Sequence, residues 1–195
     1  MALVCTTAPI DKAVSVGDLK EWARIDSDNI EQNVMLGGLI DLATSWISNF
    51  TGRTIMECAW TWTFDGFTST RQIVHLPLPP VVSVTSVEYK QESDGAYTVF
   101  SDYEADTLSL PGRLYPSYQK TWPTHRPVLD AIRVTFKAGH ADRANVPQEI
   151  KTAILMLATY LYENPDEGPG NFQESRGIPA LVKQVLGPVT FLEVY

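Results

Sequence analysis

The side chains best suited to chemistry in this sequence are three histidines, His75, His125 and His140. A histidine acts as a general base only where a nucleophile and an orienting group stand beside it. His140 and Asp142, in the segment GHADR, could pair as base and orienting carboxylate, but the residues around them supply no nucleophile. His75 alternates with Ile73 as a half-exposed strand residue would, and His125 lies in a proline-bounded loop. We therefore assign no catalytic residue and expect a protein that is not an enzyme.

The patterns that hold nucleotides, metals or sugars are also missing. No serine lies in GxSxG, and neither GxxxxGK[ST] nor GxGxxG follows a strand. Cys5 and Cys58 are far apart and outside any zinc-binding spacing, so we expect two buried or inert thiols and no disulfide framework. The rings of Trp60, Trp62, Phe64 and Phe67 could stack on sugars or bases, but the alternating pattern favours a buried sheet face. The sequence thus predicts no cofactor and no metal.

The strongest helix signal covers residues 147–163, PQEIKTAILMLATYLYE, with Pro147 suited to the first helical position. One apolar stripe follows at helical spacing: Ile150, Ala153, Ile154, Leu157, Ala158 and Leu161. Four further large side chains lie off this stripe: Leu155, Met156, Tyr160 and Tyr162. Either the helix is central and wrapped by its own domain, or this second face packs on another subunit. In the second case these four residues are the candidate subunit interface.

Two more helices are expected before residue 57. Ser15 can cap a short helix, with Asp18 in its first turn. A longer helix is predicted at about 29–51, with Gly52 as its stop. Its expected apolar stripe is Ile30, Val34, Ile40, Ala43, Ile47 and Phe50. Gly37 and Gly38 fall in its middle, which indicates a close helix crossing or a bend, and we favour the crossing.

From Cys58 onward the apolar period changes to two, which is typical of strands. The segments that alternate are CAWTWTFD, QIVHL, VSVTSVEYK, AYTVF and AIRVTFKAG, and Asp94-Gly95 marks a hairpin between the third and fourth. The predicted fold class is α+β. A small helical core from residues 1–57 and 138–163, with long helices at about 29–51 and 147–163, carries an inserted antiparallel β unit at about 58–137.

Residues 164–195 form a third predicted region: a flexible loop, a short helix from Ile178 and an extended C-terminal tail. The tail ends in closely spaced apolar residues, Val189, Phe191, Leu192, Val194 and Tyr195. A strand covered on one side by its own domain would be polar on the other. The tail therefore either pairs with the β unit of its own chain or docks on a neighbour.

Composition narrows the class of protein further. The 195 residues are 44% hydrophobic, enough for one ordinary core, and the net charge is -8 with a pI near 4.8. An acidic chain is poorly suited to gripping nucleic acid, which depends on clustered Lys and Arg. The sequence predicts neither a membrane-spanning segment nor a signal peptide, so we expect synthesis in the cytoplasm.

The order of segments resembles the head-tail connector (adaptor) family of tailed phages, prophages and gene transfer agents, in the form with a β insertion. The residues that carry the resemblance run from about Val14 to Glu163: LKEWARID, ATSWISNFTGRTI, LPLPPVVSVTSVEYKQESDGAYT, IRVTFKAGHA and VPQEIKTAILMLATYLYENPD. No single one of these motifs is unique to the family. Their ordered set is the specific feature.

The resemblance implies a virion protein of the neck, at the head-tail junction of a particle assembled in a bacterial host. It would form a ring, twelvefold in relatives, beneath the portal protein, and would bind the portal on one side and the next neck or tail-completion protein on the other. DNA would pass through the channel during packaging and ejection without sequence-specific binding. The C-terminal residues from Val189 to Tyr195 would serve as the portal-docking tail. Another neck or tail-completion ring protein is the nearest alternative, and an enzyme or glycan-binding module is a distant one.

Overall fold

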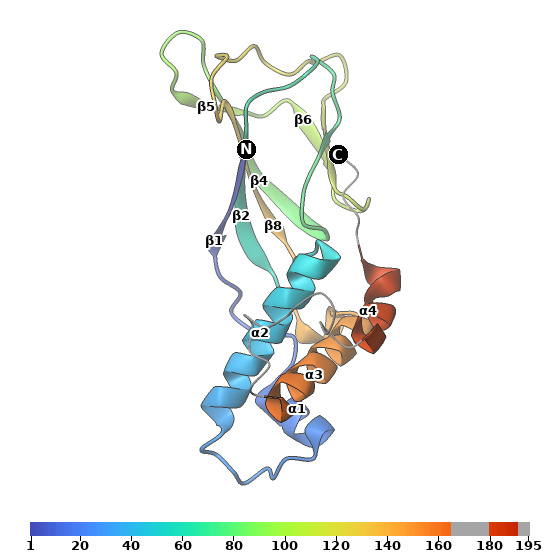
Figure 1. The fold of residues 1–195 in the computed structure, drawn as a ribbon. Helices are drawn as coiled ribbons and strands as arrows, with labels where there is room; N and C mark the ends of the chain where they lie inside the picture. Colours follow the sequence, from blue (N-terminus) through green and yellow to red (C-terminus); the bar gives the residue numbers. More distant parts are fainter. Residues whose placement is uncertain (165–179, 191–195) are drawn as a thin grey trace. The chain divides into compact units, whose positions relative to one another are not determined.

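The fold is described from a computed structural model, which covers residues 1–164 and 180–190. The chain divides into two compact units. The β unit contains Met1–Ile10 and Met56–His140, and the helical unit contains Asp11–Ile55 and the chain from Ala141 onward. Figure 1 shows the strands of the first unit and the helices of the second. The predicted α+β class is confirmed.

A five-stranded antiparallel sheet organises the β unit, in the order β1-β2-β8-β4-β5. Its strands are β1 (Ala2–Thr7), β2 (Cys58–Phe64), β8 (Ile132–Ala138), β4 (Val81–Lys90) and β5 (Tyr97–Phe100). A second sheet has the order β3-β7-β6, from β3 (Val74–His75), β7 (Arg113–Pro116) and β6 (Tyr103–Asp106). The hairpin predicted at Asp94-Gly95 is confirmed, since β4 and β5 pair directly.

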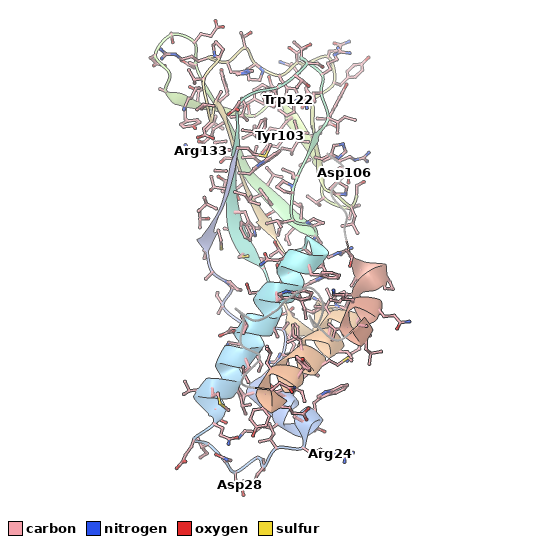
Figure 2. All side chains as sticks on the ribbon, viewed as in Figure 1. Arg24, Asp28, Tyr103, Asp106, Trp122 and Arg133 are labelled. Atoms are coloured by element: carbon pink, nitrogen blue, oxygen red, sulfur yellow. The ribbon has the colours of Figure 1, made fainter. Side chains whose placement is uncertain are left out.

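Alternation along β2 and β8 builds the core of the β unit. Trp62, Phe64, Ile132, Val134 and Phe136 lie on one face and are buried with Leu76, Leu114 and Trp122. The Trp122 ring stacks on Phe67 with centroids 4.4 Å apart, and its Nε1–H donates to the Gln72 carbonyl at 2.7 Å. Figure 2 shows Trp122 and Tyr103 within this unit. The bond from the indole ties the irregular chain around residue 72 to the core.

The described residues of the helical unit form four helices: α1 (Val16–Ala23), α2 (Asn33–Thr51), α3 (Gln148–Glu163) and α4 (Ala180–Leu186). Short 3-10 turns lie at η1 (Arg143–Asn145) and η2 (Gly187–Val189). Helix α3 is the centre of the unit, because it packs against α1, α2 and α4. Its predicted core stripe, Ile150, Ala153, Ile154, Leu157, Ala158 and Leu161, is buried as expected.

The N-terminal segment differs from the sequence prediction. Residues 1–57 were assigned to the helical core, whereas Ala2–Thr7 pair with β2 as an edge strand of the large sheet. All six residues of β1 are exposed. Because neither face of this strand is buried, no apolar alternation develops in its sequence, and the period-two signal is absent.

Two strands of the second sheet, β6 and β7, were also missed, since no alternating segment was identified between Phe100 and Ala131. Strands β6 and β7 have only four residues each, too few for a period to register. The two strands pair with each other across a short connection, and β7 also pairs with β3, which is distant in sequence. Leu114 is buried in the core, and the Arg113 guanidinium binds the Asp106 carboxylate at 2.6 Å.

Helix α2 begins at Asn33, four residues later than predicted. The preceding loop is held by hydrogen bonds that compete with helix: the buried Lys20 ammonium donates to the carbonyls of Ser27 at 3.0 Å and Asn29 at 2.8 Å. Figure 2 marks this loop with Arg24 and Asp28. The helix ends as predicted at Gly52, which adopts φ 64°.

The core stripe of α2 also differs from the prediction. It consists of Leu36, Ile40, Ala43, Ile47 and Thr51, while Ile30 and Val34 are 73% and 88% exposed. The helix is continuous through both glycines. Apart from its chain neighbours and the backbone of its own helix, a Cβ at Gly38 would meet no described atom within 4 Å, and a Cβ at Gly37 would lie 3.8 Å from Lys12 Nζ and 4.0 Å from Val16 of α1. These are ordinary van der Waals distances, so the described helices of this chain make no crossing that requires glycine at either position.

Candidate interaction surfaces

The three histidines lie in different surroundings. His125 packs edge-on against Phe67 at 5.8 Å and lies directly over Gly66, where a Cβ would fall 2.1 Å from its Nε2. The His140 carbonyl accepts the Glu57 N–H at 2.9 Å, and His75 is exposed on β3 opposite Arg113. Within the described part of the chain, no group of three or more His, Cys, Asp or Glu side chains could hold a metal.

The aromatic residues of β2 are packed inward, as expected. Trp62 and Phe64 are each 8% exposed, and Phe67 and Trp60 are partly buried against the same core. The buried rings of Trp62 and Phe64 have no open face on which a sugar or a base could stack. The aromatic set therefore contributes to packing.

The four candidate interface residues of α3 lie in different surroundings. Leu155 is 8% exposed, so the helical unit itself covers most of it. Tyr162 is half-buried, and its hydroxyl bonds to Gln32 Oε1 at 3.3 Å. Met156 and Tyr160 are half-buried and one helical turn apart, so they share a face of α3. Met156 and Tyr160 are thus the two candidate interface residues that form one partly accessible face. That another subunit covers this face stays a prediction.

Leu155 also lies at a groove of about 560 Å³ in the helical unit. The groove is lined by Ala13, Val14, Asp18, Glu21, Trp22, Arg143, Gln148, Lys151 and Leu155. Trp22, on α1, is 49% exposed. The groove therefore combines an apolar base with an accessible indole and charges of both signs. Such a surface suits contact with another protein.

Electrostatics at the groove centre on Asp18. Its carboxylate accepts the Ser15 N–H at 2.8 Å, and the Ser15 hydroxyl accepts the Asp18 N–H at 3.1 Å, which is a capping box. The backbone bond from Ser15 holds the pKa of Asp18 below its usual range, helped by the charge of Arg143. Arg143 lies 3.4 Å from Asp18 and 3.9 Å from Asp11. These ion pairs join the N-terminal end of α1 to the turn before α3.

A second apolar face on α2 was not identified from the sequence. Leu39, Leu42, Trp46 and Phe50 are half-buried, and Met35, at the same spacing, is 48% exposed. We call these five residues the outer stripe of α2. Trp46 and Phe50 stack with centroids 5.0 Å apart. The 4-3-4-4 spacing is visible in the sequence, one position before the core stripe. The predicted stripe combined Phe50 of this outer stripe with residues of the core stripe.

The C-terminal docking tail falls mostly outside the described residues. Val189 lies in η2 and is half-buried. Phe191, Leu192, Val194 and Tyr195, like the predicted loop at 165–177, lie beyond what the structure describes. The predicted short helix is present as α4, where Val182 and Leu186 are buried against the helical unit.

The two cysteines do not share one environment. Cys58 is buried, and burial raises the pKa of its thiol to about 12. Cys5 is exposed on β1. The expectation of burial therefore holds for Cys58 and is wrong for Cys5, because β1 is an edge strand that nothing in the described chain covers.

No family model matches the sequence, and no curated protein sequence matches it either. Solved structures with the same fold do exist. A chain from the neck of an empty GTA particle computed with C6 symmetry superposes with a TM-score of 0.80 at 18% identity. A chain from the virion of a native gene transfer agent (GTA) particle gives 0.77, and one from the neck of a native GTA particle computed with C12 symmetry gives 0.74, both at 18% identity. Each match covers 100% of this chain and 98% of the other.

No helix in the described part of the chain is long and apolar enough to cross a membrane. At 18% identity, the likeness to the particle chains establishes a shared fold. From end to end, this chain has the fold of chains found in the necks and virions of gene transfer agent particles.

Proposed function

We propose that this protein is a structural head-tail connector (adaptor) in the neck of a phage or phage-like particle. It forms a ring under the portal protein, extends the DNA channel and joins the head to the next neck or tail protein. The observation that carries this proposal is the end-to-end likeness to a chain of a particle neck, with a TM-score of 0.80 over 100% of this chain. If one chain had gained or lost a domain, and with it a different role, a smaller share of one of the two chains would superpose.

The surfaces of the helical unit support a ring of copies. Both long helices carry a second apolar face beside the core: Met156 and Tyr160 on α3, and the outer stripe on α2. A chain that worked alone would expose polar groups at such positions. Two different faces on one molecule can form a heterologous contact, which closes into a ring when the rotation between copies allows it. The C6 and C12 symmetries of the similar neck structures accord with such closure.

The net charge of -8 supports a passive relation to DNA. A wall rich in Lys and Arg would bind the phosphates and slow the passage of DNA, whereas an acidic wall repels them. The ring would therefore line or extend the channel without sequence-specific binding.

The nearest alternative is another ring-forming neck or tail-completion protein. Both roles use the same kind of fold and surfaces, and they differ in partner. A connector binds the portal directly, while a completion protein binds the connector or the tail. An enzyme or glycan-binding role has less support, since His125 packs over Gly66 and the rings of Trp62 and Phe64 are buried in the core of the β unit.

A binding assay separates these roles. The full chain is incubated with portal rings and, separately, with the adjoining neck protein, and the bound fraction is measured by sedimentation. We expect direct binding to the portal, and loss of that binding when Pro188–Tyr195 are deleted, because the apolar tail would make the contact. Leu108→Ser is a matched control, since Leu108 is 95% exposed in the β unit and should leave binding unchanged. Binding only to the adjoining protein would favour the completion role.

A further inference from the structure

The outermost strands of the large sheet, β1 and β5, lack the features that usually protect a sheet edge. Their sequences, ALVCTT and YTVF, contain no charged residue and no proline. Unpaired N–H and C=O groups on an edge pair readily with another chain, and proteins prevent this with charge, proline or very short edge strands. The second sheet is protected in this way, since β6 carries Glu104 and Asp106 and β3 has only two residues. Within the described chain, the edges of the large sheet are therefore open to strand addition.

Hydrogen bonds beside the β4–β5 hairpin show how the backbone groups of β4 are directed. The Lys90 N–H donates to the Ala131 carbonyl at 2.8 Å, on the β8 side of β4. The Gln91 N–H donates to the Ala96 carbonyl at 3.0 Å, on the β5 side. Along an antiparallel ladder the bonding direction alternates from one residue to the next. In this part of the sheet, β4 therefore bonds β8 through its even-numbered residues and β5 through its odd-numbered residues.

The same alternation identifies the backbone groups that face outward at each edge. On β5, Thr98 and Phe100 lie opposite odd-numbered residues of β4, so their backbone groups face β4. The backbone groups of Tyr97 and Val99 face outward.

At the other edge, the alternation is carried across β8 and β2, whose register is regular. It directs the backbone groups of Thr61 and Thr63 toward β1, opposite the even-numbered residues of that strand. The backbone groups of Leu3 and Cys5 therefore face outward. Each edge thus presents two outward residues that are two positions apart.

The two edges also match in direction and in length. Every neighbouring pair in the large sheet is antiparallel, so its first and fifth strands, β1 and β5, run the same way. Strand β1 keeps a regular register over Ala2–Cys5, up to the bulge before Thr7, and β5 spans Tyr97–Phe100. Neighbouring copies in a ring with the C12 symmetry of the similar neck structure differ by a small rotation. A sheet that continued from one copy to the next would therefore join β1 to β5 as a parallel pair.

We propose that β1 of one copy adds to β5 of the next copy as a parallel strand, so that the large sheets of neighbouring copies join edge to edge. This inference rests on the ring proposed above and names one contact within it. The outward groups of Leu3 and Cys5 pair with those of Tyr97 and Val99, and main-chain hydrogen bonds of this kind supply the affinity of strand addition.

The pairing also predicts which side chains become neighbours. In a parallel ladder, one residue bonds to the two residues that flank its opposite partner. Cys5 of one copy therefore lies opposite Thr98 of the next copy or, one step along the ladder, opposite Phe100. Pairing of β1 with β1 would instead require a two-fold axis between the copies, which neighbours in a ring do not have.

Cross-linking on assembled particles tests the contact. Thr98→Cys places a thiol on β5, near the exposed Cys5 of the next copy, whereas Cys58 is buried and should not react. The full-length variant is bound to portal-bearing heads, treated with a short bismaleimide, digested and mapped by mass spectrometry, and the same sample is imaged. We expect peptides that link Cys5 to position 98, and a ladder of covalent oligomers on a denaturing gel. In the matched control, Leu108→Cys, the new thiol is equally accessible but lies outside the large sheet, so it should not link to Cys5.

A second pair of variants tests the backbone bonds. Val99→Pro removes an outward N–H without removing a bond between β4 and β5, and proline is tolerated at such positions of an edge strand. It should melt like the wild-type protein and assemble on heads about tenfold more weakly, as expected when one hydrogen bond per contact is lost. Val99→Thr keeps the N–H and should assemble normally.

The outcomes separate this contact from the ring itself. A ring in which Cys5 does not link to position 98, or links only to Cys5 of another copy, overturns the strand addition and leaves the connector standing. Normal assembly of Val99→Pro overturns it as well. Portal vertices that stay bare with the wild-type protein overturn the connector, and the strand addition with it.

Discussion

Leu157 and Tyr160 lie three positions apart on α3 and have different surroundings. Leu157 is 1% exposed in the core of the helical unit, whereas Tyr160 is half-buried on the face it shares with Met156. The first residue is covered by its own chain. The second belongs to the face that we propose for contact between copies.

This difference gives the first prediction. Leu157→Ala should lower the free energy of unfolding by about 2–5 kcal/mol, because it removes buried methyl groups and leaves a cavity. Tyr160→Ala should lower it less and should weaken ring assembly more. Urea denaturation of the free protein, beside an assembly assay on portal-bearing heads, measures both effects. Equal losses of stability, with assembly unaffected by Tyr160→Ala, would mean that this face of α3 serves its own chain alone.

Single residues were predicted from the sequence with uneven success. The spacing of apolar residues on α3 identified its core stripe correctly, because the apolar pattern of a helix that is buried along its length repeats regularly. Leu155 was grouped with accessible residues, yet it is 8% exposed and lines the groove together with residues of α1 and the turn before α3. That burial arises between segments distant in sequence, which a one-dimensional period does not record.

At the scale of elements, α1 begins where its local capping residues predicted. Ser15 and Asp18 satisfy each other's backbone amides in a capping box, as the Ser-x-x-acid spacing suggested. Elements with strong local signals were predicted well: α1, α3, β2, β8 and the β4–β5 hairpin. Strands β1, β6 and β7 are short or exposed edge segments, and their pairing is set by the sheet they join.

The capping box yields the second prediction. Ser15→Ala should cost about 1 kcal/mol of stability, the usual loss for an N-cap hydroxyl. Asp18→Asn should show a pH dependence as well. Because hydrogen bonding and Arg143 depress the folded pKa of Asp18, its carboxylate stabilises the fold above the usual aspartate pKa of about 3.9. That stability is lost as the pH falls through the folded pKa.

The measurement is the free energy of unfolding of wild type and Asp18→Asn between neutral and strongly acidic pH. The difference between the two proteins should shrink as the pH falls below about 4. Ser15→Ala with Asp18→Asn in one chain should cost less than the sum of the single changes, because the two residues cap the same turn. A difference that stays constant with pH would show that the charge of Asp18 contributes no stability.

At the scale of the whole molecule, both the fold and the net charge are consistent with the proposed connector. The chain shares its entire fold with chains of particle necks and virions, and its acidity accords with the proposed channel, whose wall would repel DNA. The order of helices around a β insertion was apparent from the sequence. The assignment of the N-terminal segment to the β unit was not, because an edge strand exposed on both faces resembles an extended linker.

The central claim is that copies of this chain form a ring on the portal. Its most direct measurement is imaging by electron microscopy of tailless, DNA-filled heads after incubation with the purified protein. We expect new density directly beneath the portal, arranged as a closed ring. The β unit and the helical unit should each fit separately into the density of every repeat of this ring. Vertices that stay bare, or density that appears only after another neck protein is bound first, would contradict the claim.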